Sequence, residues 1–130
     1  MTEFGCARCY GKDALTALAF CTTRLRETHR LVERSHFGIS LRECPECGQR
    51  FVAIFTEFVD WTGGEDSQYF DVVPLTGAEA EKLAAQGKDV DLDALGALGS
   101  TRRRLASDWP TGAGKTISWK SGPLSVEEGY

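Results

Sequence analysis

The 130-residue chain has no long hydrophobic run: no apolar stretch approaches the ~20 residues that a membrane-spanning helix needs. Its N-terminus has no basic region followed by an apolar run, so we expect no secretory signal. The hydrophobic share of 42% and the charged share of 26% are those of an ordinary globular protein. The length suits one domain. These absences predict a single cytoplasmic domain over residues 1–124.

Positive charge is also not in excess, because the net charge is −4. Residues 1–50 have eight Lys/Arg and six Asp/Glu, residues 51–95 have two and ten, and residues 96–130 have five and three. Electrostatic binding to the phosphate backbone of a nucleic acid needs clustered Lys and Arg side chains. We therefore expect a protein partner, and a basic one, rather than nucleic acid, a membrane or a small-molecule substrate.

Cysteine is the most informative residue type that the chain does contain. Four of the five cysteines fall in two Cys-x-x-Cys segments, residues 6–11 and 44–48, and each pair is soon followed by glycine. Two such segments can supply the four thiolates of a tetrahedral zinc site, which leaves no open position for water or substrate. The predicted ligands of a structural Zn²⁺ are Cys6, Cys9, Cys44 and Cys47. Cys21 remains as a spare thiol, expected to be buried as a small apolar residue.

These two segments resemble the metal knuckles of the zinc-ribbon and rubredoxin class. In that class, the glycine after the second cysteine lets backbone amides turn toward the sulfurs. The segment Cys-Pro-Glu-Cys-Gly at 44–48 matches this pattern, whereas Tyr10 separates Cys9 from its glycine. The intervening segment, 10–43, is long for a plain ribbon and indicates an inserted helix. A rubredoxin-type iron site, a pair of redox disulfides and a site that has lost its metal stay open as alternatives.

The chain predicts an α+β fold with an antiparallel sheet of about four strands and two helices. Apolar residues three or four apart, with Asp13 as a cap, predict one helix from Asp13 to Arg34 that ends at Gly38. A capping box of Thr76 and Glu79, with Gly87 as a stop, predicts a second helix over 77–86. The predicted strands are residues 50–61, 69–75, 102–109 and 115–120, the first of them covered on both faces.

Two short segments have less definite patterns. Residues 88–99 are acidic and then rich in small residues, which fits either a loose helical turn or a loop. Residues 125–130 show no pattern, and we expect a disordered tail there.

Several features that suggest catalysis or nucleotide binding have simpler explanations. Gly112 to Thr116 resembles a phosphate loop, but Trp109 stands where the first glycine belongs and the flanks alternate like strands. His29 and His36 have no serine or aspartate motif beside them, so neither is expected to be a catalytic base. The basic run Arg102–Arg104 is more typical of a strand edge that avoids pairing than of a nucleic-acid contact. We therefore expect no enzymatic activity.

Acidic residues converge on the hairpin predicted between the first two strands, with two aromatic residues beside them. Such a surface is typical of protein binding, although a solvated turn has the same composition. The predicted partner-binding residues are Glu57, Asp60, Trp61, Glu65, Asp66, Tyr69 and Asp71. The sequence thus favours a non-catalytic, zinc-stabilised protein-binding module, of the kind of a small bacterial immunity protein or inhibitor that blocks a basic toxin. The alternatives are a zinc-ribbon accessory protein that binds nucleic acid and a rubredoxin-like electron carrier.

Overall fold

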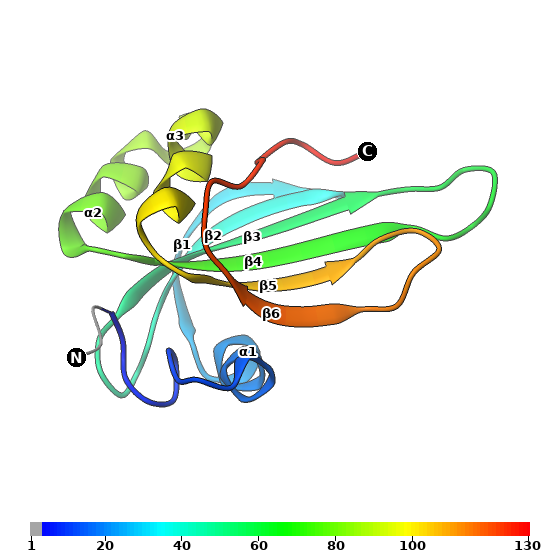
Figure 1. Cartoon of the computed structure of the whole chain (residues 1–130). Helices are drawn as coiled ribbons and strands as arrows, with labels where there is room; N and C mark the ends of the chain where they lie inside the picture. Colours follow the sequence, from blue (N-terminus) through cyan, green and yellow to red (C-terminus); the bar gives the residue numbers. More distant parts are fainter. Residues whose placement is uncertain (1–3) are drawn as a thin grey trace.

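A computed structural model describes residues 4–130 and shows one six-stranded antiparallel sheet. Each strand pairs with the next one in the sequence, so the sheet is a simple meander (Figure 1). Its strands are β1 (Arg26–Arg34), β2 (Phe37–Glu43), β3 (Arg50–Phe58), β4 (Ser67–Leu75), β5 (Arg104–Trp109) and β6 (Thr116–Lys120). The prediction of an α+β fold with an antiparallel sheet is confirmed, but the sheet has six strands rather than about four.

The two additional strands correct the prediction of one helix from Asp13 to Arg34. Helix α1 (Ala14–Thr23) does begin at the Asp13 cap, but it ends at the Thr22–Thr23 pair. The chain then returns as β1, whose β-branched Thr28 and Val32 suit a pleated strand better than a helix. Gly38 does not end a helix; it lies inside β2, opposite Glu33.

The strands predicted from residue 50 onward are confirmed, although some of their ends differ from the predicted ones. Phe51, Val52, Ala53 and Ile54 of β3 are all at most 2% exposed. Consecutive side chains of a strand point to opposite faces, so the sheet must be covered on both sides at this point. The segment from Gly112 to Thr116 is the β5–β6 turn, as its alternating flanks predicted.

The upper face of the sheet in Figure 1, the face of Ile54 and Val73, is covered by helices that follow β4. Helix α2 (Gly77–Gln86) has the predicted capping box, and Gly87 ends it with φ 58°. A 3₁₀ turn η1 (Gly87–Asp89), helix α3 (Leu92–Ala97) and a second 3₁₀ turn η2 (Leu98–Thr101) complete the layer. The described residues therefore contain three α-helices rather than two, since α3 lies within 88–99.

The lower face, the face of Phe51 and Val72, is covered by α1 and by the N-terminal cysteine segment (Figure 1). Apolar residues of α1 pack there with Cys9, Tyr10 and Cys44. The second hydrophobic core of the fold is therefore built around the cysteines themselves.

The last residues contain neither helix nor strand and run across the upper face (Figure 1). Leu124 N donates to Gly96 O at 3.0 Å, and Tyr130 N donates to Glu57 O at 3.0 Å. The disorder predicted for 125–130 concerns motion in solution and stays a prediction. Within residues 4–130, no helix is both long enough and apolar enough to cross a membrane.

Candidate metal centre

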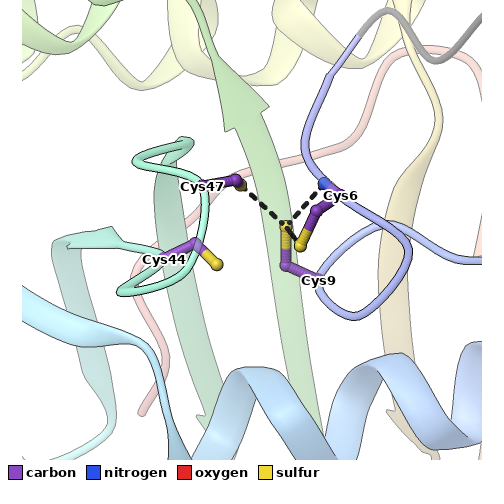
Figure 2. A group of neighbouring side chains, drawn as sticks. All are labelled: Cys6, Cys9, Cys44 and Cys47. Atoms are coloured by element: carbon purple, nitrogen blue, oxygen red, sulfur yellow. Dashed lines mark hydrogen bonds between the residues drawn. The ribbon is translucent and has the colours of Figure 1, made fainter.

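The two Cys-x-x-Cys segments lie side by side at one end of the sheet, although α1 and the first two strands separate them in the chain (Figure 2). Cys6 and Cys9 come from the loop that precedes α1, and Cys44 and Cys47 come from the turn between β2 and β3. The β1–β2 hairpin returns the chain to its starting point, which brings the second segment beside the first. The described structure thus confirms the predicted cluster of four cysteines.

The spacing of the sulfur atoms fits a tetrahedral metal ion. All four Sγ atoms lie within 4.8 Å of one another. The Sγ–Sγ distance is 3.6 Å from Cys6 to Cys9 and 3.7 Å from Cys9 to Cys47. With Zn–S bonds of ~2.3 Å, the edge of a tetrahedron would be about 3.8 Å. The four sulfurs therefore stand where ligands of one ion would stand.

Backbone hydrogen bonds fold each segment into a tight turn. Tyr10 N donates to Cys6 O and Gly48 N donates to Cys44 O, both at 2.9 Å. The first turn also aims Cys6 N at Cys9 Sγ, at 3.3 Å. Gly48 has φ 79°, a conformation that favours glycine, so this position fits the pattern of the zinc-ribbon class.

The glycine of the first segment with positive φ comes before its cysteines rather than after them. Gly5 has φ 66°, and a Cβ there would lie 2.8 Å from Cys9 Sγ and 2.7 Å from Tyr10 Cβ. Gly11 has no positive φ, but a Cβ there would lie 2.3 Å from Ala7 O. Both glycines therefore allow the backbone to close tightly around the sulfurs.

Gln49 joins the two segments, and sequence reasoning missed it. Its Oε1 accepts a hydrogen bond from Gly5 N at 2.9 Å. Its Nε2 donates to Arg50 O at 2.7 Å and to Leu75 O at 2.6 Å. One amide side chain thus connects the first segment, the second segment and the end of β4. Its position directly after the Cys-x-x-Cys-Gly motif is the only sequence signal that could have indicated it.

An arginine that packs against two aromatic rings, themselves in edge-to-face contact, fixes the first segment to the sheet. The guanidinium carbon of Arg103 lies 4.1 Å from the ring centroid of Tyr10 and 3.9 Å from that of Trp119. Tyr10 Oη donates to Arg103 O at 2.8 Å, and Arg103 Nη2 donates to Tyr10 O at 2.5 Å. These contacts join the two ends of the chain, so no local pattern could have predicted them.

The electrostatics of the cluster favour a bound cation. Cys9 and Cys44 are 0% and 1% exposed, whereas Cys47 is exposed. Burial raises the pKa values of Cys9 and Cys47, because a thiolate is costly to desolvate. Burial also acts to raise the pKa of Cys6, but backbone N–H groups of Cys9 and Arg8 outweigh it and lower that pKa to about 7. Four thiolates this close together need a positive charge to offset their repulsion.

The remaining cysteine and the two histidines lie outside this cluster. Cys21 is fully buried, its Sγ donates to Cys9 O at 3.7 Å, and burial raises its pKa to about 12. His36 Nδ1 lies 3.0 Å from Glu57 Oε1, and His29 Nδ1 lies 3.1 Å from Thr28 Oγ1. Within residues 4–130, the metal-ligand set is therefore four cysteines without histidine.

The seven predicted partner-binding residues do not share one surface. The first group, called the acidic tip here, lies in the loop between β3 and β4 and comprises Asp60, Trp61, Glu65 and Asp66. Trp61 is 81% exposed. Glu57 lies on the lower face, where its carboxylate accepts one hydrogen bond from Gln68 and pairs with His36. Tyr69 and Asp71 lie on the upper face, and Asp71 is bonded to Arg104 at 3.1 Å.

The three arginines of the run Arg102–Arg104 have three separate sets of contacts. Arg102 forms a bidentate ion pair with Glu79, at 2.6 and 2.9 Å. Arg103 stacks beside the metal-site segment, and Arg104 is buried with Asp71. The run therefore forms no continuous basic surface.

Comparisons of the chain with known protein families, with curated proteins and with solved structures found no match to any of them. The interpretation of the site consequently depends on its geometry and chemistry.

Proposed function

We propose that the four cysteines hold a structural Zn²⁺ and that the domain is a non-catalytic protein-binding module. The observation that carries the metal assignment is the convergence of four sulfurs within 4.8 Å from two segments that are distant in the sequence. Soft thiolates in a tetrahedral set are typical of zinc and of iron–sulfur sites. Because all four positions are protein ligands, the ion would cross-link the chain and offer no site for turnover.

The acidic tip supports protein binding as the function of the module. Trp61 is 81% exposed at the end of a long hairpin, where an aromatic side chain can serve as an anchor for a partner. The loop that presents it has defined contacts: Asp60 Oδ1 accepts from Gly63 N at 2.8 Å, and Asp66 Oδ1 accepts from Asp60 N at 2.9 Å. A preorganised loop loses less entropy on binding than a free one.

The charge of the hairpin favours a basic partner, as an inhibitor or immunity-type protein would need. Residues 50–75, which form the β3–β4 hairpin, contain five acidic residues and one arginine, a net charge of −4. Such an excess accelerates association with a positive surface. A nucleic-acid accessory function has less support, because Arg102 and Arg104 are committed to ion pairs with Glu79 and Asp71.

An iron electron carrier remains the second candidate, because the same four sulfurs suit a rubredoxin-type ion. Metal analysis of the protein purified from its native cells distinguishes the two. Zinc in a 1:1 ratio and a colourless protein support the module, whereas iron and a visible absorption band would overturn the zinc assignment.

Capture of the partner from the native cells, followed by binding kinetics, tests the protein-binding proposal. The double variant Glu65→Lys/Asp66→Lys should slow association about tenfold and flatten its salt dependence, because steering depends on charge. Trp61→Ala should mainly raise the dissociation rate. The matched control is Glu81→Lys/Asp93→Lys, which makes the same charge change at exposed positions of α2 and α3. If the tip and control variants slowed association equally, the acidic tip would not be the binding surface.

A further inference from the structure

A groove on the lower face of the sheet lies beyond the region that α1 covers. It has a volume of about 370 Å³, within the usual range of small-ligand pockets. Leu18 and Thr22 of α1 line one side of it, and Trp109 and Lys115 line another. It is separate from the four cysteines and from the acidic tip, so its function would go beyond the module proposed above.

The floor of the groove is aromatic. Phe55 of β3 lies directly opposite Phe70 of β4, and Phe70 lies opposite Ser107 of β5. These three residues form one row across three strands on the same face, and both phenylalanines remain partly exposed. An aromatic floor with a hydroxyl at its edge suits a planar ligand that stacks on the rings.

The charge of the groove is opposite to the charge of the chain. Arg42 and Lys115 line the groove, and no Asp or Glu side chain among residues 4–130 does. Lys115 Nζ lies 5.8 Å from the Trp109 ring centroid, and the Arg42 guanidinium lies 5.6 Å from that of Phe70. The nearby Glu57 carboxylate already bonds to His36 and Gln68. In a protein of net charge −4, the groove is therefore a locally cationic surface.

Arg42 is the strongest evidence for a ligand. It is partly buried, and its Nε donates to Ser40 Oγ at 3.1 Å. Among residues 4–130, its two terminal amino groups have no hydrogen-bond acceptor, and no carboxylate forms an ion pair with it. Burial lowers the pKa of Arg42, since desolvation disfavours its charge, although the neighbouring Glu27 acts in the opposite direction. The described residues contain no buried side-chain nitrogen without a hydrogen-bond partner, so the two terminal amino groups of Arg42 are accessible from the groove. They can therefore donate to an anion that enters it.

We propose that this groove binds a small planar organic anion, an aromatic or conjugated carboxylate, whose ring stacks over Phe55 and Phe70 and whose carboxylate pairs with Arg42. The carboxylate would accept two parallel hydrogen bonds from the terminal amino groups of Arg42, the geometry that guanidinium and carboxylate groups favour. Lys115 lies in an exposed loop and adds attraction at the mouth of the groove.

The test uses the full chain and three probes, benzoate, indole-3-carboxylate and 2-naphthoate, with neutral 2-naphthamide as the matched control ligand. Calorimetric titration measures affinity, and amide shifts of Phe70 and Ser107 in NMR spectra locate the site. We expect 2-naphthoate to bind in the millimolar range or tighter. We expect 2-naphthamide to bind at least about tenfold more weakly, because it lacks the charge that Arg42 recognises.

Variants separate the groove from non-specific attraction. Arg42→Met should weaken 2-naphthoate binding about tenfold or more and leave 2-naphthamide unchanged. Lys115→Met, in an exposed loop where folding is not at risk, should weaken it about threefold. Arg26→Met is the control, since this exposed arginine of β1 lies outside the groove. The proposal is overturned if none of the three anions binds, if 2-naphthamide binds as tightly as 2-naphthoate, or if Arg42→Met and Arg26→Met have equal effects.

Discussion

Removal of the metal should lower the free energy of unfolding of the domain, and the size of this loss follows from the length of the loop that the metal closes. The proposed ion would link Cys9 to Cys44 and so close a loop that contains α1, β1 and β2. Treated as a cross-link that closes a loop of roughly 35 residues, it removes about 13 cal/mol/K of entropy from the unfolded chain, which is about 4 kcal/mol at 25 °C. A domain of this length has an unfolding entropy of about 270 cal/mol/K, so its Tm should fall by about 15 °C.

Scanning calorimetry with and without a metal chelator measures this shift, and elemental analysis verifies that the metal has left. The Cys44→Ser variant should have the Tm of the metal-free wild type, and the chelator should not lower it further. Cys21→Ala is the matched control, because Cys21 is equally buried but lies outside the four-sulfur cluster. It should lose only about 1–2 kcal/mol to its small cavity and keep the full chelator effect. An unchanged Tm in metal-free wild-type protein would refute the reasoning.

Two further predictions concern the upper layer. Glu79→Gln keeps the capping box but removes the charge that faces Arg102, and should cost about 1–2 kcal/mol, less than a fully buried pair because Glu79 remains 28% exposed. The Arg102 hydrogen bonds lower the pKa of Glu79. Their contribution to the free energy of unfolding is therefore fully present above the ordinary pKa of 4.5 and is lost as the pH falls through the lower pKa of the folded state. Acid unfolding monitored by circular dichroism should show this loss in the wild type and not in the variant. Gly96→Ala should cost about 1–3 kcal/mol in urea unfolding, because a Cβ would lie 2.2 Å from Leu124 O, whereas Gly77→Ala, with open space around it, should be neutral or slightly stabilising.

The four-cysteine cluster was predictable because its sequence signals are local. Each Cys-x-x-Cys turn can be recognised within a single short segment, and two such turns together indicate a four-cysteine metal site. The same holds for α2, whose capping box and terminal glycine are signals within one turn of the helix ends. Gln49 and the Tyr10–Arg103–Trp119 contacts were missed because their partners are distant in the sequence.

The error at residues 24–34 has a different cause. Leu25, His29 and Val32 are three or four residues apart, which imitates a helical stripe. In the structure, β1 is an edge strand with five exposed residues at its start and two irregularities in its pairing with β2. Such an edge strand does not show strict alternation, since only part of it contacts a core. The β-branched residues Thr28 and Val32 were the signal that favoured a strand over the helix suggested by the apparent spacing.

The distance between the four-cysteine cluster and the acidic tip allows an experiment to distinguish an effect on stability from an effect on partner binding. Cys47 precedes β3 and Trp61 follows it, so the whole of this strand (9 residues) lies between them. At ~3.3 Å per residue, the strand alone holds the two about 30 Å apart. A metal at one end does not touch the acidic tip, so it influences binding at the tip itself only through the fraction of folded protein. Loss of binding in a cysteine variant at temperatures far below its Tm would therefore implicate a surface near the metal rather than the acidic tip.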